Sequence, residues 1–450
     1  MKRLIISALA AMLCLCSGVR ALETKLSLEQ CETQALVNSP EVAASAAQYS
    51  AAVAAASATV SAVLPTLNLE GSAYYQGTVI EMQMPGRTIR TGDNWNLAVG
   101  PALYVPLYDF GARRLGARAA GAAALARKFE LEAAKRSALL AVRTAYFNVV
   151  LAAEQNYLAG QYLGLALEQY ADTEKRAAAG EKTRIDVLQF RQEVFARRKR
   201  YILAGKALGE ALNGLFSLTG AFPPDTANPA DARLAALKLD GVEPPTALIA
   251  SDGFEILDTR LSPAEKKQLT QANPSLQSAA YLKRSAELAA RQLNAQRWLD
   301  IQFYAKAQAN YPKGPVENMF NQNIAGINIS MPLWEYGRKQ SLSAQQEHFA
   351  EAYDRKYAAA NRDIKRGWKN ALEGLAFLRR ELLTDTEAQR EAGELAELVY
   401  KSYSAGAAQY LEVQAANVRA LNAASETALT RAQILLQLAV LDSLAETPDN

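Results

Sequence analysis

The residues that most often carry catalysis or bind metal ions are scarce in this sequence of 450 residues. His348 is its one histidine, which excludes paired-histidine zinc sites, and Cys31 is the one cysteine beyond residue 21. The run Gly180-Glu181-Lys182-Thr183 ends like a phosphate-binding loop but lacks the glycine that such a loop carries earlier. A Gly-x-Ser-x-Gly motif is also absent from the sequence. We therefore expect no enzymatic activity, no cofactor and no metal site.

Charge and the first residues narrow the class of protein further. The formal net charge of +3 is small and its contributors are interspersed, so nothing favours a nucleic-acid partner. Residues 1–21 combine two early basic residues, an apolar run and small residues, which is typical of a secretory signal peptide. Cys14 and Cys16 each follow a leucine, where a lipoprotein signal has a small residue. Beyond residue 21, no window reaches the ~20 apolar residues that a membrane-spanning helix needs.

The sequence contains an internal duplication. Pro106-Leu107-Tyr108-Asp109-Phe110-Gly111 recurs as Pro332-Leu333-Trp334-Glu335-Tyr336-Gly337, at an offset of 226 residues. The turn at Gly180 recurs at Gly406 with the same offset of 226. Two independent motifs that keep one spacing indicate a repeated unit. Upstream, Pro40 matches Pro274 at an offset of 234, so the first half carries about eight extra residues.

Each half follows the same order of expected elements. Residues 27–63 have helical character, and Pro65 ends that helix. Residues 66–79 then alternate apolar and polar side chains, which predicts a strand with one apolar and one polar face. We expect the polar stretch 84–93 to be a longer loop. The same alternation predicts three further strands, around 95–107, 301–310 and 325–331.

Long proline-free segments follow the second strand of each half. Residues 112–178 and 338–404 contain no proline, so each can form one helix of roughly 100 Å at about 1.5 Å per residue. Apolar residues at heptad spacing predict packing along these helices and the returning ones. They include Val187, Val194, Tyr201, Leu208 and Leu215, then Ile364, Trp368, Ala371, Leu375, Leu378 and Leu382, and finally Val418, Leu421, Ala428, Ala432, Leu435 and Ala439.

The expected domains follow from the duplication. Repeats over 22–218 and 271–446 are joined by a linker subdomain over 219–270, in which prolines and glycines are scattered. The signal peptide over 1–21 precedes the repeats, and a short tail over 447–450 follows them.

Four strands with one apolar face pose a problem of closure if they lie in a membrane. An open sheet edge in lipid leaves backbone groups without hydrogen bonds. Two chains would give eight strands with an interior filled by side chains, whereas three chains give twelve strands around an opening. A soluble amphipathic sheet would explain the alternation but not two separated hairpins. We expect an α+β membrane protein in which each duplicated chain gives four transmembrane strands to a shared trimeric barrel, with a long periplasmic coiled-coil helical barrel.

These motifs resemble the TolC family of outer-membrane efflux proteins. The likeness rests on the helix that ends at Pro65, the strand-to-helix junctions from Pro106 to Gly111 and from Pro332 to Gly337, and the turns at Gly180 and Gly406. The resemblance implies a homotrimeric outer-membrane exit duct for tripartite efflux or type I secretion, with an equatorial region formed by the linker. It also implies two partners, a periplasmic adaptor and an inner-membrane transporter.

By this resemblance, three residues near the glycine turns match positions that close the tunnel at its periplasmic tip. Glu412 falls where the family has an acidic residue that faces the pore. Asp186 and Tyr403 fall where an acid and a tyrosine hold neighbouring helices together. The alternative is that Asp186 and Glu412 only cap the helices that begin after the turns.

The sequence departs from the family at two positions of the tip. Ala408 stands where an arginine link is expected, and Ala415 stands where a second pore acid is expected. We therefore expect the closed state to be held more weakly, or to be held by Arg184 and Lys182 instead. A periplasmic coiled-coil adaptor or scaffold is the competing function, because it would share the long helices and the export signal; the four alternating strands favour the channel.

Overall fold

The computed structural model describes residues 27–220, 254, 269 and 273–445. The expected signal peptide, nearly all of the linker 219–270 and the tail 447–450 lie outside these residues. The chain divides into two compact units. We call residues 44–134 and 271–363 the strand unit, and residues 1–43, 135–270 and 364–450 the helical unit.

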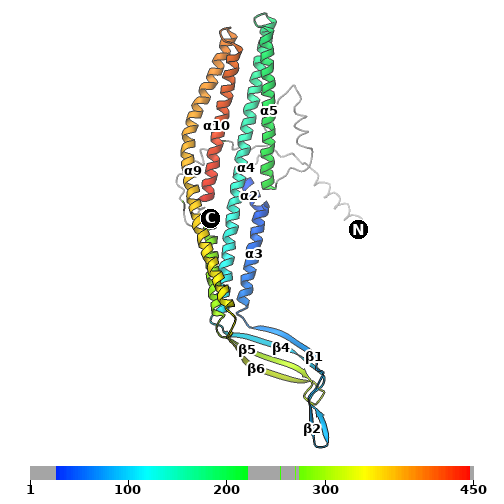
Figure 1. Ribbon diagram of the computed structural model, residues 1–450. Coiled ribbons are helices and arrows are strands. Elements are labelled where there is room, and N and C mark those ends of the chain that lie inside the picture. The colour runs from blue at the N-terminus through cyan, green and yellow to red at the C-terminus, as the bar shows by residue number, and fades with distance from the viewer. Residues whose placement is uncertain (1–26, 221–253, 255–268, 270–272, 446–450) are drawn as a thin grey trace, which may run out of the picture. The chain divides into compact units, whose positions relative to one another are not determined.

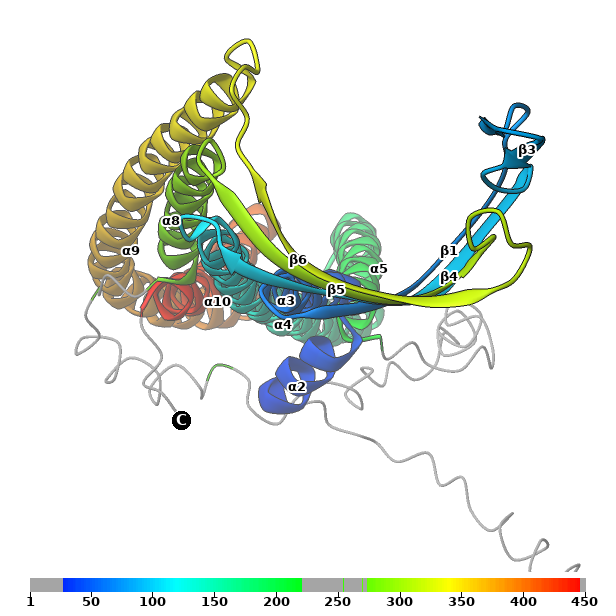
Figure 2. The same ribbon diagram turned by 90° about the horizontal axis from the view of Figure 1, so that it is seen from below.

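The strand unit contains an antiparallel sheet of four strands in the order β1-β4-β5-β6. All four expected strands are present, as β1 (Thr66–Tyr75), β4 (Trp95–Tyr108), β5 (Asp300–Tyr311) and β6 (Phe320–Ser330). The sheet is bent into an arc (Figure 2). Because β1 and β6 are the outer strands, each has one edge that pairs with no other strand in the described part of the chain.

The segment that follows β1 differs from the expectation. The strand ends at Tyr75, and the predicted loop 84–93 instead belongs to a small hairpin of β2 (Glu81–Met84) and β3 (Arg87–Arg90). Pro85 and Gly86 form its turn, with Gly86 at φ 86°. A proline followed by a glycine suits a tight turn, because proline presets φ and glycine tolerates a positive φ. This hairpin accounts for the extra residues of the first half.

The register confirms that apolar residues of the four strands share one face. Leu67 lies opposite Leu103, which lies opposite Ala305 and then Ala325 across the sheet. Asn68, the next residue along β1, and the residue opposite it on β4 lie on the other face of the sheet. Leu67 and its neighbour Leu69 are 71% and 79% exposed, so the described part of the chain does not cover this apolar face at β1.

The helices match the expected ones except at the start. Residues 27–63 form two helices, α2 (Leu28–Asn38) and α3 (Pro40–Ser61), and not one. Ser39 is extended between them, because a residue that precedes proline is biased away from helix. The remaining helices are α4 (Ala112–Ala178), α5 (Arg184–Thr219), α8 (Pro274–Ala295), α9 (Arg338–Ser404) and α10 (Tyr410–Leu444).

The duplication is visible in these bounds. The helices α4 and α9 are each 67 residues long, and α9 begins 226 residues after α4. The returning helices keep the same offset, because α10 begins 226 residues after α5. In the helical unit, α4 with α5 and α9 with α10 form two hairpins with tight turns (Figure 1). The equivalent of α3 in the second half is α8, which begins at Pro274 with Asn273 as its cap.

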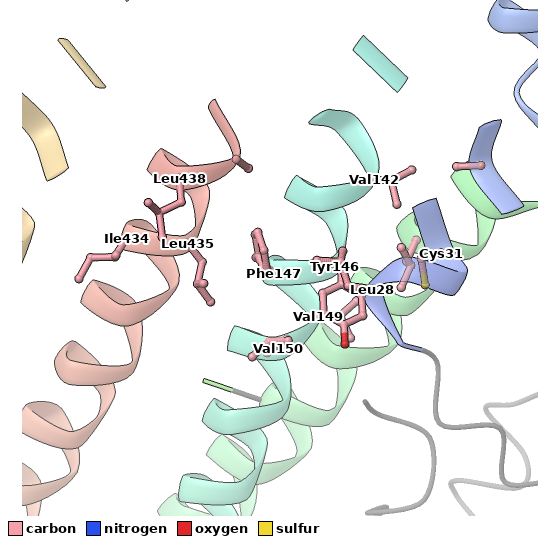
Figure 3. Close-up of a cluster of buried hydrophobic side chains, with 14 of the residues drawn as sticks. Leu28, Cys31, Val142, Tyr146, Phe147, Val149, Val150, Ile434, Leu435 and Leu438 are labelled. Carbon is pink, nitrogen blue, oxygen red and sulfur yellow. The ribbon is translucent and has the colours of Figure 1, made fainter. Parts of the chain in front are cut away.

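The helical unit is held together by an apolar core. Phe147 of α4 lies between Leu435 of α10 and Leu28 of α2 (Figure 3), and all three are buried. Each such side chain contributes about 1.5 to 3 kcal/mol by leaving water. Cys31 is fully buried in the same core, and this burial raises the pKa of its thiol to about 11.

Most heptad positions are confirmed as packing positions. Ala371 and Leu375 are buried in the core, and Trp368, Leu378 and Leu382 pack against it. Val194, Tyr201, Leu208 and Leu215 are likewise buried. Val418 is an exception, because it is 36% exposed although the spacing predicts burial.

One glycine in the sheet gives a test of the strand packing. A Cβ at Gly100 would lie 2.0 Å from the carbonyl oxygen of Ala307, whereas a Cβ at Gly71 would meet nothing closer than 3.8 Å. We expect Gly100→Ala to destabilise the protein by about 1 to 3 kcal/mol, because β4 and β5 must move apart. Thermal unfolding followed by circular dichroism measures this, with Gly71→Ala as the control. Equal melting temperatures for the two variants would contradict the close approach of β4 and β5.

Candidate functional site

The strand-to-helix junctions have the same backbone in both halves. Phe110 and Gly111 have φ values of 52° and 79°, and Tyr336 and Gly337 have φ values of 49° and 77°. Two consecutive residues with positive φ are unusual, and a glycine at the second position lowers the strain. The conserved pattern within the duplicated chain therefore encodes one sharp turn, used twice.

Side chains reinforce the first junction. The carboxylate of Asp109 accepts hydrogen bonds from the backbone amides of Gly111 and Arg113, at 3.0 and 2.8 Å. These bonds cap the first turn of α4, where the amides have no helical partners. At the second junction Glu335 forms ion pairs with Arg338 and Lys339, both at 3.4 Å.

The prolines named from the sequence lie where strands begin, end or bulge. Pro65 stands between α3 and β1, and Pro332 follows β6. Pro106 lies within β4, at the point where the pairing with β5 shifts register before Tyr108. Proline has no amide hydrogen for the ladder, so an irregularity of this kind is where it fits.

The two glycine turns join the helical hairpins. Gly180 and Gly406 have φ values of 82° and 80°, in the region that favours glycine. After the first turn, Thr183 and Asp186 form a capping box: the Asp186 carboxylate accepts from the Thr183 amide, and the Thr183 hydroxyl accepts from the Asp186 amide. After the second turn, Glu412 accepts a hydrogen bond from the Gln409 amide at 3.3 Å. Both acidic residues therefore do cap helices.

Asp186 also belongs to a cluster that joins the two turns. Lys182 Nζ donates a hydrogen bond to the carbonyl oxygen of Tyr403 at 3.0 Å and lies 3.8 Å from the centre of the Tyr403 ring. Cation–π contacts of this kind contribute about 0.5 to 1 kcal/mol at exposed sites. The structure thus brings together three of the residues selected from the sequence, all within one chain.

The charges of this cluster explain the shifts of two pKa values. Burial raises the pKa of Tyr403, and the nearby Asp186 carboxylate raises it further. Partial burial disfavours the charged form of Asp186, but hydrogen bonds from Thr183 outweigh this and lower the pKa of Asp186. Tyr403 is 3% exposed, so its hydroxyl is buried close to the Asp186 carboxylate. Asp186 and Tyr403 are therefore neighbours whose charges influence each other.

The other two candidates of the tip lie at the surface. Arg184 is the first residue of α5, and Glu412 is in the first turn of α10; both are exposed. The structure therefore does not place them in the cluster of Lys182, Asp186 and Tyr403. Ala408, at the position without the expected arginine, packs partly buried beside Phe190, Tyr403 and Val413.

Several residues that link the two hairpins were not identified from the sequence. Arg176 of α4 donates to the carbonyl oxygen of Ser404 at 2.7 Å, and the Tyr400 hydroxyl donates to Asp172 at 2.9 Å. Tyr410 donates to the carbonyl oxygen of Gln189 at 3.0 Å. Burial first, and then the charge of Glu193, raise the pKa of Tyr410 to about 12. The available signal was the spacing of Asp172 and Arg176, which is typical of a helical ion pair.

Two further properties concern the described residues as a whole. No helix among them combines the length and the apolar character that crossing a bilayer requires. In the same residues, no group of three or more histidine, cysteine, aspartate or glutamate side chains is placed to hold a metal ion.

Solved structures with this arrangement are outer-membrane channels. The chain is similar to CusC, with a TM-score of 0.72 and 18% identity over 94% of this chain and 92% of that one. It is also similar to the outer membrane protein VceC of Vibrio cholerae, with a TM-score of 0.70 and 18% identity over 93% and 95% of the two chains. At this level of identity the likeness defines the fold, which is that of the TolC-like channels.

Sequence comparison defines the family. The model of the outer membrane efflux protein family matches residues 33–221 and 267–445, and the chain belongs to that family. A curated relative, the pyoverdine export outer membrane protein OpmQ of Pseudomonas aeruginosa, is 26% identical over 90% of this chain and 82% of its own length. The protein is thus an outer-membrane efflux channel, which is the exit duct of a tripartite efflux system. Its helical portion lies in the periplasm. Membership of this family argues against the competing function, which was a periplasmic adaptor or scaffold.

The two faces of the sheet give a test of membrane insertion. In an outer-membrane strand the apolar face meets lipid and the polar face meets water. We expect Leu69→Arg to reduce the amount of assembled protein in the outer membrane, because a charge near the bilayer midplane costs about 2 to 4 kcal/mol. Asn68→Arg, one residue away on the polar face, is the control. Heat-modifiable migration of the outer-membrane fraction on gels measures assembly, and equal losses for both variants would exclude lipid contact at Leu69.

Proposed function

We propose that three copies of the chain join edge to edge, β1 of one copy to β6 of the next, and close a barrel of twelve strands. The support is the strand order, which leaves one edge of β1 and one edge of β6 without a strand partner in the described chain. In lipid these edges need partners, because the hydrocarbon offers no hydrogen bonds. β1 and β6 of one chain run in opposite directions, so β1 of one copy can form an antiparallel pair with β6 of the next copy.

The trimer acts as a passive conduit that is closed at its periplasmic tip. The tip cluster of Lys182, Asp186 and Tyr403 supports this proposal, because it ties the start of α5 to the end of α9. Contacts between the two hairpins oppose any movement that separates their turns. In this proposal an inner-membrane transporter supplies the energy, and a periplasmic adaptor connects it to the channel.

The exposed Glu412 gives the closed tip a charge. Three copies around one axis would form a ring of carboxylates, which attracts cations and repels anions. Glu412 can cap the helix and attract cations at the same time. Its carboxylate accepts several hydrogen bonds, and the Gln409 amide uses only one of them. Capping and charge selection are therefore compatible at this position.

Oligomeric state tests the proposed barrel directly. We expect the protein, extracted from the outer membrane in mild detergent, to have three times the mass of one chain. Native mass spectrometry and light scattering after size-exclusion chromatography both give this mass. A stable monomer or dimer that still forms channels would contradict closure by three copies.

One lysine variant and one arginine variant test the tip cluster. We expect Lys182→Met to raise single-channel conductance, because it removes a hydrogen bond of about 1 kcal/mol and a cation–π contact from each of three chains. Arg184→Met removes the same charge from the same turn without these contacts, so it should leave conductance unchanged. Recordings in planar bilayers measure both. The opposite ranking would assign the closed state to Arg184, and no effect of either variant would place the gate elsewhere.

A third variant tests the carboxylate ring. Glu412→Gln should lower the preference for cations and weaken block by trivalent cations, because it removes three negative charges from the tip. Glutamine can still accept the hydrogen bond from the Gln409 amide, so the amount of assembled protein should not change. The reversal potential in a salt gradient measures selectivity. An unchanged reversal potential would leave Glu412 as a helix cap only.

A further inference from the structure

Charged side chains are rare on the four long strands, all of which the structure describes. Only Glu70, Asp300 and Lys306 occur among their residues. The register places all three on the polar face of the sheet, opposite to the face of Leu67 and Leu69. Amide and hydroxyl side chains make up most of the rest of this face, namely Thr66, Asn68, Ser72, Tyr74, Asn96, Tyr104, Gln302, Tyr304, Gln308, Asn310, Gln322, Asn328 and Ser330.

Glu70 and Lys306 form an ion pair that spans three strands. Lys306 Nζ on β5 lies 2.8 Å from Glu70 Oε2 on β1. The Tyr104 hydroxyl on β4, the strand between them, donates a hydrogen bond to the other carboxylate oxygen of Glu70 at 2.5 Å. The two side chains are about two-thirds to three-quarters buried, with exposures of 33% and 27%. Both oxygens of the carboxylate are thus occupied.

Small residues on β4 make room for this bridge. Gly100 lies opposite Glu70, and Ala102 lies opposite Lys306. Since neighbouring strands are about 4.8 Å apart, β1 and β5 are separated by roughly 10 Å, and the pair must cross the surface of β4. A larger side chain at Ala102 would stand in that path, whereas at Gly100 even a Cβ would meet the backbone of Ala307 on β5. The local sequence of β4 is therefore suited to a charge pair that reaches over it.

The remaining charge on this face is also compensated. Both carboxylate oxygens of Asp300 accept hydrogen bonds from the Arg113 guanidinium, at 3.1 Å each. A bidentate pair of this kind fixes the geometry of both partners. Every charged side chain on the polar face of the four strands is therefore matched by one of opposite sign.

We propose that the Glu70–Lys306 pair keeps the lumen of the strand barrel free of net charge, so that the exit of the duct passes solutes of either sign. The inference rests on the proposed function, because the polar face borders a lumen only if the chains close a barrel. Selection by charge is then confined to other parts of the tunnel. The pair makes Glu70 and Lys306 selectivity-determining residues, since either one alone would add a ring of three like charges to the lumen.

A pair that only braces the sheet would have the same geometry, so the test must separate charge from stability. Reversal potentials of the full-length trimer in planar bilayers, under a potassium chloride gradient, report the ratio of cation to anion permeability. Glu70→Gln leaves Lys306 uncompensated and should lower this ratio roughly twofold, because three unscreened positive charges repel cations. Lys306→Met should raise the ratio by a similar factor. The double variant Glu70→Gln with Lys306→Met should return it to the value of the native protein.

The charge swap Glu70→Lys with Lys306→Glu covers the case in which a single variant fails to assemble. It keeps the pair and should keep the permeability ratio of the native channel. Assembled single variants with the native ratio, or an assembled swap with an altered ratio, would overturn the proposal. Absence of any channel activity in the native protein would instead contradict the proposed function, and the two failures are therefore distinguishable.

Discussion

The requirement that every backbone group in lipid has a hydrogen-bond partner governs this structure. The four strands of one chain satisfy it along three interfaces, between β1 and β4, β4 and β5, and β5 and β6, and leave it unsatisfied at the two outer edges. In the proposed barrel other copies supply the partners for these edges, which links the fold of the chain to its assembly. The exposed apolar face of the sheet follows from the same condition, because a sheet surrounded by lipid has no need of a covering layer.

Duplication gives this chain two of everything that a strand-to-helix conduit needs. Each half supplies a pair of strands, a sharp junction with two residues at positive φ, a helix of 67 residues and a tight glycine turn. The halves are not interchangeable. The β2–β3 hairpin occurs in the first half, and Lys182 of the first turn contacts Tyr403 before the second, so the contacts across the tip join unlike partners.

Periodic and repeated features of the fold could be predicted from the sequence, whereas local interruptions could not. The helices 112–178 and 338–404 were found with their bounds because glycine turns and proline-free runs mark both ends. The break at Ser39-Pro40 and the hairpin around Pro85-Gly86 were missed, since each depends on two or three residues within a longer pattern. At the tip, the sequence pointed to Lys182 as an alternative but not to its position on the Tyr403 ring, because contacts across 221 residues leave no periodic signal. The links of Arg176 and Tyr400 were missed for the same reason.

The buried thiol of Cys31 has a practical meaning for spectroscopy. It is the one cysteine beyond residue 21, it is fully covered by the core, and its pKa of about 11 keeps it in the unreactive thiol form near neutral pH. Maleimide dyes and spin labels need an accessible thiolate, so they should ignore Cys31 in the folded protein. In a protein without residues 1–21, and thus without Cys14 and Cys16, the remaining sequence serves as its own unlabelled background, and a single cysteine introduced at a helical turn or a strand can report distances between copies of the chain.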